Sequence, residues 1–159
     1  MTLNKIFKNV FLAVVLGFVL SACAQQVKKV DSQIQGDVYT GTDTVEYLAA
    51  GVPDRVFFAT NESILTTKSR DTLRKQAAWL RKNSSINIVI EGHADERGTR
   101  EYNLALGERR ATAARDYLVA LGLDQNRIKT ISYGKERPID ARSVEDAWSK
   151  NRRSVTTVD

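Results

Sequence analysis

A short polar stretch of the chain gathers side chains that can bind charged groups: His93, Asp95, Glu96, Arg97 and Arg100 fall within eight positions. A carboxylate neutralises an ammonium group, and a guanidinium group binds a carboxylate through two parallel hydrogen bonds. Loops held by a rigid scaffold commonly carry function, although a solvated charged turn has the same composition. Residues of these types can bind a ligand that carries both signs of charge.

The helix expected after this stretch brings one more arginine to its buried side. At about 100° per residue the apolar positions form one sector, in which Arg110 and Asn103 fall and from which Arg109 is excluded. A guanidinium on the side that packs against a sheet needs an anionic or hydrogen-bonding partner, and Asp95 is the nearest carboxylate in the preceding loop. Two interpretations stay open: a closed internal salt bridge, or two halves of a ligand site.

A strand before the polar stretch and a helix after it must position these residues. Alternation over residues 86–91 places Ile86, Ile88 and Ile90 on one face of a strand. Helical spacing predicts a helix over about residues 102–121, ended by Gly122. The strand, the loop and the helix therefore form one unit that sets Asp95 relative to Arg110.

The rest of the pattern predicts an α/β fold. Leu73, Ala77 and Leu80 share one face of an earlier helix. The element order is β, α, β, α, β, a short helix and β, which predicts a two-layer sandwich with two main helices packed on one face of a mixed sheet and the other face partly open. The remaining predicted elements are a strand over 55–60, a helix from Thr66 or Thr67 to residues 82–84, a strand over 128–133, a short helix over 144–150 and a strand over 152–158.

The N-terminal residues have the pattern of a secretory signal. Lys5 and Lys8 precede an apolar run over residues 10–20 that is too short to span a bilayer. The run ends in Leu-Ser-Ala-Cys, which resembles the lipobox of bacterial prolipoproteins and predicts a lipoprotein signal peptide over residues 1–22 and acylation, including palmitate, of Cys23. Ala24 follows, and the sorting rule known for such lipoproteins then points to the outer membrane, with the protein anchored on its periplasmic face.

The mature chain divides into a tether and one domain. Residues 23–51 are polar without a sustained period and are expected to form a flexible, lipidated tether, within which residues 45–50 are a candidate for a helical turn that docks on the domain. Residues 52–159 are expected to form one globular domain. Cys23 is the only cysteine, so no internal disulfide can form.

The charge of the chain does not favour a nucleic-acid partner. Removal of residues 1–22 takes away Lys5 and Lys8 and no acid, so the formal charge of +5 falls by 2 to +3. Basic and acidic residues are interspersed, and a periplasmic destination excludes nucleic acid in practice.

Four motifs carry a resemblance to a known family: GHADERG at 92–98, EYNLALGERRA at 101–111, SYGKERP at 132–138 and SKNRRSV at 149–155. They resemble the C-terminal peptidoglycan-binding domain of the OmpA family, and most closely its lipid-anchored members. The similarity covers roughly residues 52–158, with the motifs in the family's order and spacing.

The resemblance implies a noncovalent pocket for the diaminopimelate of the peptidoglycan stem peptide. Asp95 stands where the family has its key acid and Arg110 where it has its key arginine, so that the acid would neutralise an ammonium group and the arginine would bind a carboxylate. Asn103 matches the family's asparagine and would hydrogen-bond the peptide, and Leu104 would wall the pocket.

The first loop departs from the family's pattern. Members often carry acids after the first strand, in a pattern such as FDFD, whereas this chain has Phe58, Ala59, Thr60 and Asn61. Asn61 can still hydrogen-bond to a ligand, but Ala59 offers no side-chain acceptor. The family's acidic contact at that position is therefore missing.

The function implied is that of an outer-membrane lipoprotein that links the membrane to the cell wall, with TolB and TolA as partners and a part in envelope integrity and cell division. The alternative is an OmpA-family wall anchor that serves another envelope machine. A peptidoglycan amidase or peptidase is disfavoured, because His93 is the only histidine and the domain has neither a cysteine nor a serine in a nucleophile motif. No cofactor or metal is expected.

Other residues of the motifs are assigned structural roles. His93 is expected to orient the loop rather than to act in catalysis. Arg152 and Arg153 match the family's arginine pair and are expected to brace the pocket, with an acidic partner as the second possibility. Phe57 and Phe58 are expected in the core and the pocket wall.

Overall fold

The structure is a computed structural model of the chain, in which residues 37–43 and 46–159 are described. The predicted signal peptide, Cys23 and residues 24–36 of the predicted tether lie outside the described residues, so the predicted divisions at residues 22 and 51 stay predictions. Within the described ranges, none of the helices combines the length and the apolar character that crossing a membrane requires.

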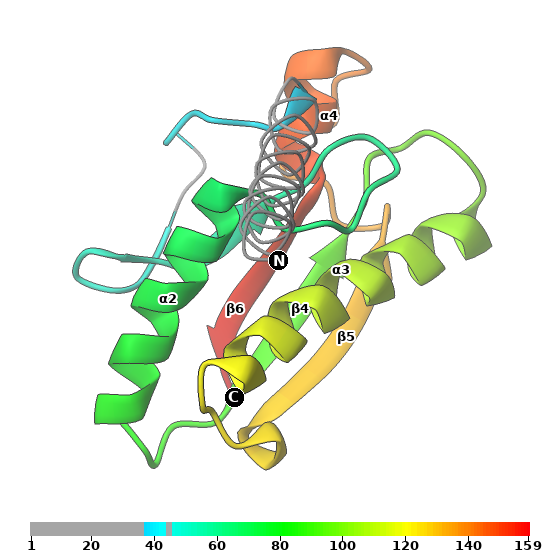
Figure 1. The fold of residues 1–159 in the computed structure, drawn as a ribbon. Coiled ribbons are helices and arrows are strands. Elements are labelled where there is room, and N and C mark those ends of the chain that lie inside the picture. Colours follow the sequence, from blue (N-terminus) through cyan, green and yellow to red (C-terminus); the bar gives the residue numbers. More distant parts are fainter. Residues whose placement is uncertain (1–36, 44–45) are drawn as a thin grey trace, which may run out of the picture. The chain divides into compact units, whose positions relative to one another are not determined.

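A four-stranded mixed sheet forms the centre of the domain (Figure 1). Its strands lie in the order β3, β6, β4, β5, with β4 parallel to β5 and β6 antiparallel to both β3 and β4. The bounds are β3 Arg55–Phe57, β4 Ile88–His93, β5 Ile128–Gly134 and β6 Arg153–Val158. The mixed sheet predicted from the element order is confirmed.

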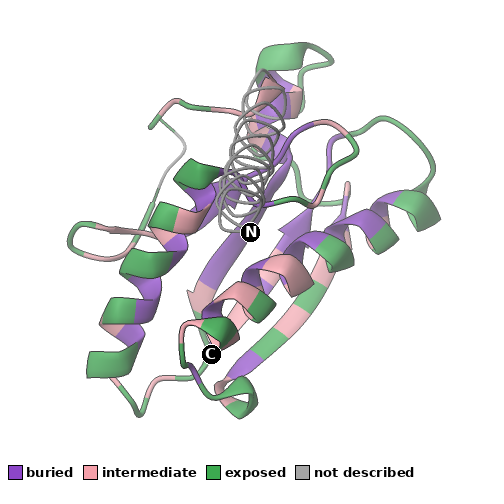
Figure 2. Ribbon diagram, viewed as in Figure 1, coloured by how far each residue is buried: buried purple, intermediate pink, exposed green. Residues whose placement is uncertain are grey.

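Two long helices cover one face of this sheet (Figure 1). Helix α2 spans Thr67–Lys82 and helix α3 spans Arg100–Ala120, and the sides that they turn to the sheet are the buried ones in Figure 2. The opposite face is partly open, since Ile131 of β5 is 40% exposed while Val155 of β6 is buried. The core under the helices includes Leu73, Ala77, Leu80, Ile88, Ile90, Ala111, Ala114 and Leu118. The two-layer sandwich is therefore confirmed.

The helix ends follow from local hydrogen bonds. Thr66 caps α2, because its side chain accepts a hydrogen bond from the Ser69 backbone N–H, and Thr99 caps α3 in the same way. Gly122, just past α3, has a φ of +90°, a conformation that suits glycine at a helix C-terminus. The short helices are η2, Gln125–Arg127, and α4, Glu145–Asn151.

Strand β3 is shorter than predicted for a physical reason. The prediction ran to residue 60, but the backbone leaves the sheet after Phe57. The carbonyl of Phe58 accepts a hydrogen bond from Arg152 Nε at 3.2 Å, and the carbonyl of Ala59 accepts one from Arg110 Nη2 at 3.0 Å. Arginine side chains thus take the acceptors that a neighbouring strand would use.

The helical turn expected at residues 45–50 is wrong. Residue 45 lies outside the described part of the chain, and β1, Tyr47–Ala49, pairs antiparallel with β2, Val52–Pro53. Gly51 permits this tight reversal because its φ is +73°, which a residue with a Cβ rarely adopts. A hairpin therefore replaces the predicted turn at the entrance to the domain.

Helix α3 lies unusually close to the sheet at one point. A Cβ atom on Gly92 of β4 would stand 1.8 Å from the carbonyl oxygen of Gly107, and one on Gly107 would stand 2.3 Å from Ser132 Oγ of β5. No side chain fits between the two backbones. This contact fixes the height of α3 above β4 and hence the position of Arg110 relative to the loop that follows β4.

Candidate functional site

Asp95 lies in the loop after β4, buried, with two arginines as partners. Arg97 Nη2 donates to its Oδ2 at 2.7 Å, Arg97 Nε and the Arg97 backbone N–H both donate to its Oδ1 at 3.1 Å, and Arg152 Nη1 lies 3.5 Å from Oδ2. Burial alone would raise the pKa of the Asp95 carboxyl, but the hydrogen bonds and charge of Arg97 and the charge of Arg152 outweigh it and lower the pKa. The carboxylate is therefore ionised at neutral pH.

Arg110 is fully buried, as its helix position predicted, but its partners are backbone carbonyls. Its Nε donates to the Glu62 carbonyl at 2.9 Å, Nη1 to that of His93 at 2.8 Å and Nη2 to that of Ala59 at 3.0 Å. Within the described part of the chain, Asp95 and Arg110 share no hydrogen bond or ion pair. Of the two interpretations left open, the closed internal salt bridge is therefore not observed, and the ligand site stays a prediction.

The charge of Arg110 nevertheless belongs to the same electrostatic cluster. Burial and the charge of Arg152 lower the pKa of its guanidinium to about 9, while the negative charge of Asp95 acts in the opposite direction. Since this pKa is still above neutrality, the group is cationic at pH 7. Arg110 ties the first loop, residues 59–62, to the end of β4.

Asn103 faces the central loop from the first turns of α3. It is 2% exposed, and its side-chain amide donates to the Arg97 carbonyl at 2.9 Å. Lys135 closes the same loop from outside, with Nζ 3.1 Å from the Glu96 carbonyl and 2.7 Å from that of Gly98. The loop that carries Asp95 is thereby held on both sides.

Asn61 lies in the first loop, and Leu104 follows Asn103 in α3. Asn61 is exposed and adopts a φ of +57° at the tip of the first loop, between the carbonyls that bond Arg110. The backbone of Leu104 lies on the β5 side of α3, where its carbonyl accepts from Ser132 Oγ at 2.7 Å. Asp95, Arg110 and Asn103 are thus brought together around one loop, whereas the backbone of Leu104 faces Ser132 of β5.

Sequence reasoning did not pair Arg152 with the residues that it contacts. Arg152 is fully buried and donates to Phe58, to the Asp37 carbonyl and to Glu145 Oε1, the last at 2.7 Å. In the sequence, only the position of Arg152 in the arginine pair of the fourth motif indicated a role for it. Its hydrogen bonds agree with the expected role of bracing the pocket. Arg153 points elsewhere and donates to the carbonyls of Asn151 and Arg137.

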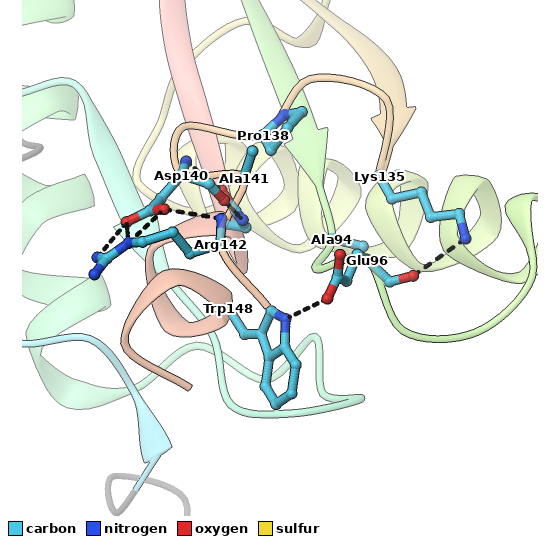
Figure 3. Close-up of a pocket in the computed structure, with 9 residues that line it drawn as sticks. Ala94, Glu96, Lys135, Pro138, Asp140, Ala141, Arg142 and Trp148 are labelled. Carbon is cyan, nitrogen blue, oxygen red and sulfur yellow. Dashed lines mark hydrogen bonds and ion pairs between the residues drawn. The ribbon is translucent and has the colours of Figure 1, made fainter. Parts of the chain in front are cut away.

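Trp148 of α4 was also missed. The Arg97 guanidinium lies over its ring, with Cζ 4.2 Å from the centroid, and the indole N–H donates to Glu96 Oε1 at 3.0 Å. Figure 3 shows Glu96 between Trp148 and Lys135 at the edge of a cavity of about 180 Å³. A single tryptophan near the C-terminus gives no sequence signal that it meets the central loop.

His93 does not have the surroundings of a catalytic base. Its ring is 1% exposed, and burial, followed by the charges of Arg153, Arg137 and Arg55, lowers its pKa to about 3. The ring is neutral at pH 7, and its carbonyl, not its imidazole, contacts Arg110. Among the residues that the structure describes, no three His, Cys, Asp or Glu side chains are grouped so that they could hold a metal ion.

The comparisons of this chain with known proteins agree with one another. The model of the OmpA family matches residues 57–152. A peptidoglycan-associated lipoprotein of Mesorhizobium japonicum is 44% identical over 152 residues, which cover 94% of this chain and 90% of the relative. One of Agrobacterium fabrum is 40% identical over 161 residues, which cover 98% of this chain and 91% of the relative.

A solved structure agrees with these matches. The crystal structure of the peptidoglycan-associated lipoprotein from Burkholderia pseudomallei superposes with a TM-score of 0.65 at 35% identity, over 67% of this chain and 90% of that one. Helices α2 and α3 and the first three motifs fall within residues 57–152, the region that the family model matches. The chain therefore belongs to the OmpA family, in which peptidoglycan-associated lipoproteins are its relatives along nearly the whole sequence.

Proposed function

We propose that this protein binds peptidoglycan noncovalently at the end of the sheet where Asp95 lies. The observation that carries the proposal is one ionised, nearly buried carboxylate held by two guanidinium groups, in a chain whose relatives are named for their association with peptidoglycan. The residues on either side of Asp95, Ala94 and Glu96, line a cavity. A set of fixed charges of both signs suits a ligand that is itself zwitterionic.

Diaminopimelate of the stem peptide has the chemistry that this cluster accepts. Its ammonium group replaces the Arg97 guanidinium on Asp95, because the Arg97 side chain is 39% exposed and has room to turn outward. Its carboxylate then meets the arginines that Asp95 releases. Arg110 uses three of its five N–H donors on backbone carbonyls, so its main part is to hold the first loop in place for the ligand.

The wider role follows from the predicted lipid anchor. Acyl chains on Cys23 would hold the protein in the outer membrane, and the domain would hold the cell wall, which links the two layers. By analogy with the family's lipoproteins, we place the protein in the Tol-Pal system with TolB and TolA as partners, in support of envelope integrity and cell division. The alternative, an anchor for another envelope machine, predicts that TolB does not co-purify with the correctly folded protein.

Co-sedimentation with purified sacculi tests the proposal. The variant Asp95→Asn keeps the shape of the side chain but removes the charge, and we expect a loss of affinity of about tenfold or more, because a hydrogen bond to a charged group contributes roughly 1.5–3 kcal/mol. The matched control is Asp116→Asn, an exposed acid on α3 whose partner is its neighbour Arg115.

Two outcomes would contradict the proposal. One is that Asp95→Asn, with a native circular dichroism spectrum, pellets with sacculi as well as the wild type does. The other is release of soluble muropeptides by the purified protein, which would indicate an enzyme rather than a binding protein.

A further inference from the structure

A segment outside the region matched by the family model lies against the proposed site. Residues 37–43, called the strap below, precede the domain, whereas the family match begins at residue 57. The Asp37 carboxylate accepts a hydrogen bond from the Thr60 backbone N–H at 2.8 Å, and the Asp37 carbonyl accepts one from Arg152. The strap therefore touches both the first loop and the arginine that pairs with Asp95.

The Asp37 carboxylate of the strap belongs to a group of opposite charges around Asp95. Three guanidinium groups, Arg97, Arg110 and Arg152, interact with three carboxylates, Asp37, Asp95 and Glu145. Without Asp37 the cluster carries one surplus positive charge close to the first loop. A carboxylate is the group that would restore the balance, and Asp37 supplies one from within the chain.

Contacts further along the strap hold it in place and leave part of it exposed. The Tyr39 ring meets Phe57 edge-on at 4.8 Å, Lys68 Nζ donates to the Thr40 carbonyl at 2.8 Å, and Lys150 Nζ lies 3.2 Å from Asp43. Thr40 and Asp43 are exposed. Surface contacts of this kind are weak singly, so the strap can leave without unfolding the domain.

A cavity beside the strap also indicates that the strap can leave the domain. A cavity of about 330 Å³ separates residues 37–41 from Glu145, Asp146 and Ser149 of α4. The Tyr39 hydroxyl is buried without a hydrogen-bond partner. Close packing marks a permanent part of a core, and the strap is not closely packed on the side that faces this cavity.

We propose that the strap closes the peptidoglycan site and that the Asp37 carboxylate stands where a ligand carboxylate binds, so that wall binding requires the strap to leave. This inference rests on the proposed function. The opposite role, in which Asp37 replaces the acid that the first loop lacks at Ala59 and helps to bind the ligand, predicts the opposite sign of effect. We favour competition, because Asp37 adds a negative charge beside the arginines that must accept the ligand's own carboxylate.

Calorimetric titration of the full-length chain in detergent with a diaminopimelate-containing tripeptide distinguishes the two roles. We expect Asp37→Ala to bind the tripeptide several-fold more tightly than the wild type. Tyr39→Ala, which removes the ring contact with Phe57 but no charge, should also bind the tripeptide more tightly than the wild type. The control Asp116→Ala changes the net charge equally and should leave the affinity unchanged.

Hydrogen exchange gives a second readout that does not depend on affinity. Saturating tripeptide should speed exchange of the backbone N–H groups of residues 38–41, because ligand and strap compete. Unchanged or weaker binding by Asp37→Ala, or slower strap exchange with ligand, would overturn the strap proposal and leave the proposed function standing. If the wild type binds neither tripeptide nor sacculi, both proposals fail.

Discussion

Arg110 shows how a buried charge can be accommodated without an ion pair. Its planar guanidinium donates to three carbonyls from two segments, of which the Ala59 carbonyl also accepts a hydrogen bond from the Glu62 backbone N–H at 3.2 Å. A direct salt bridge with Asp95 would have taken both charges out of reach of a ligand. The carbonyl partners leave Asp95 to interact with Arg97, whose side chain is half-exposed.

Replacement of Arg110 should therefore lower the stability of the domain directly, and affect ligand binding only as a consequence. We expect Arg110→Ala to lower the free energy of unfolding by roughly 3–5 kcal/mol, since three carbonyls each lose a hydrogen bond from a charged donor, and each such bond contributes about 1–3 kcal/mol. Urea denaturation followed by circular dichroism measures the loss. Arg109→Ala, an exposed neighbour on the same helix, is the control and should change stability by less than about 0.5 kcal/mol. Equal stability of the two variants would show that Arg110 does not hold the first loop.

At the scale of elements, the site depends on the approach of α3 to β4 and β5. Gly92 and Gly107 face each other, and the Ser132 side chain fills the remaining space and bonds the Leu104 carbonyl. One turn beyond this contact, Arg110 reaches the carbonyls of the first loop. A change in helix height of even one ångström would separate these groups beyond hydrogen-bond distance.

The substitution Gly107→Ala tests this contact through the sign of its effect. Alanine ordinarily stabilises a helix by about 1 kcal/mol relative to glycine, but here its Cβ would stand 2.3 Å from Ser132 Oγ. We expect a net destabilisation of roughly 1–3 kcal/mol from overpacking, measured as a lower midpoint in urea. The comparison variant is Ala105→Gly, at an exposed position of α3, which should cost about 1 kcal/mol through helix propensity alone. A more stable Gly107→Ala variant would contradict the close approach.

The long elements could be predicted from the sequence because their signals are local. Periodicity and caps placed α2, α3, β4 and β5 within about two residues of their observed ends. The early end of β3 could not be predicted, because it depends on arginines 51 and 94 positions away in the sequence. The β1–β2 hairpin was missed because a three-residue strand is too short to show alternation.

The candidate site was predictable in its residue types but not in its bonds. Helix geometry correctly predicted that Arg110 and Asn103 are buried and that Arg109 is exposed. The partners of Arg110 are carbonyls, which every residue has, so no residue type marks them. The contact of Arg152 with Asp37 joins positions separated by 115 residues, and nothing local to either position indicates it.

At the scale of the whole described domain, one charge cluster joins segments that are remote in sequence. Asp37 comes from the strap, Asp95 and Arg97 from the loop after β4, and Arg152 from the junction of α4 and β6. Burial would raise the pKa of both the Asp37 and the Asp95 carboxyl, but the surrounding hydrogen bonds and arginine charges lower both. The ionised carboxylates therefore stabilise the folded state.

The sign of the pH dependence follows from these lowered pKa values. A carboxyl whose pKa is lower in the folded state contributes stability above its unfolded pKa of about 3.9, and the contribution disappears as pH falls through the folded pKa. We expect Asp95→Asn to be less stable than the wild type by about 1–3 kcal/mol near pH 7, and the difference to be smaller at about pH 3, below the unfolded pKa. Urea denaturation at both pH values measures the difference, with Asp116→Asn, an exposed acid, expected to match the wild type at each. A difference that stays constant with pH would mean that the shape of Asp95, rather than its charge, holds these remote segments together.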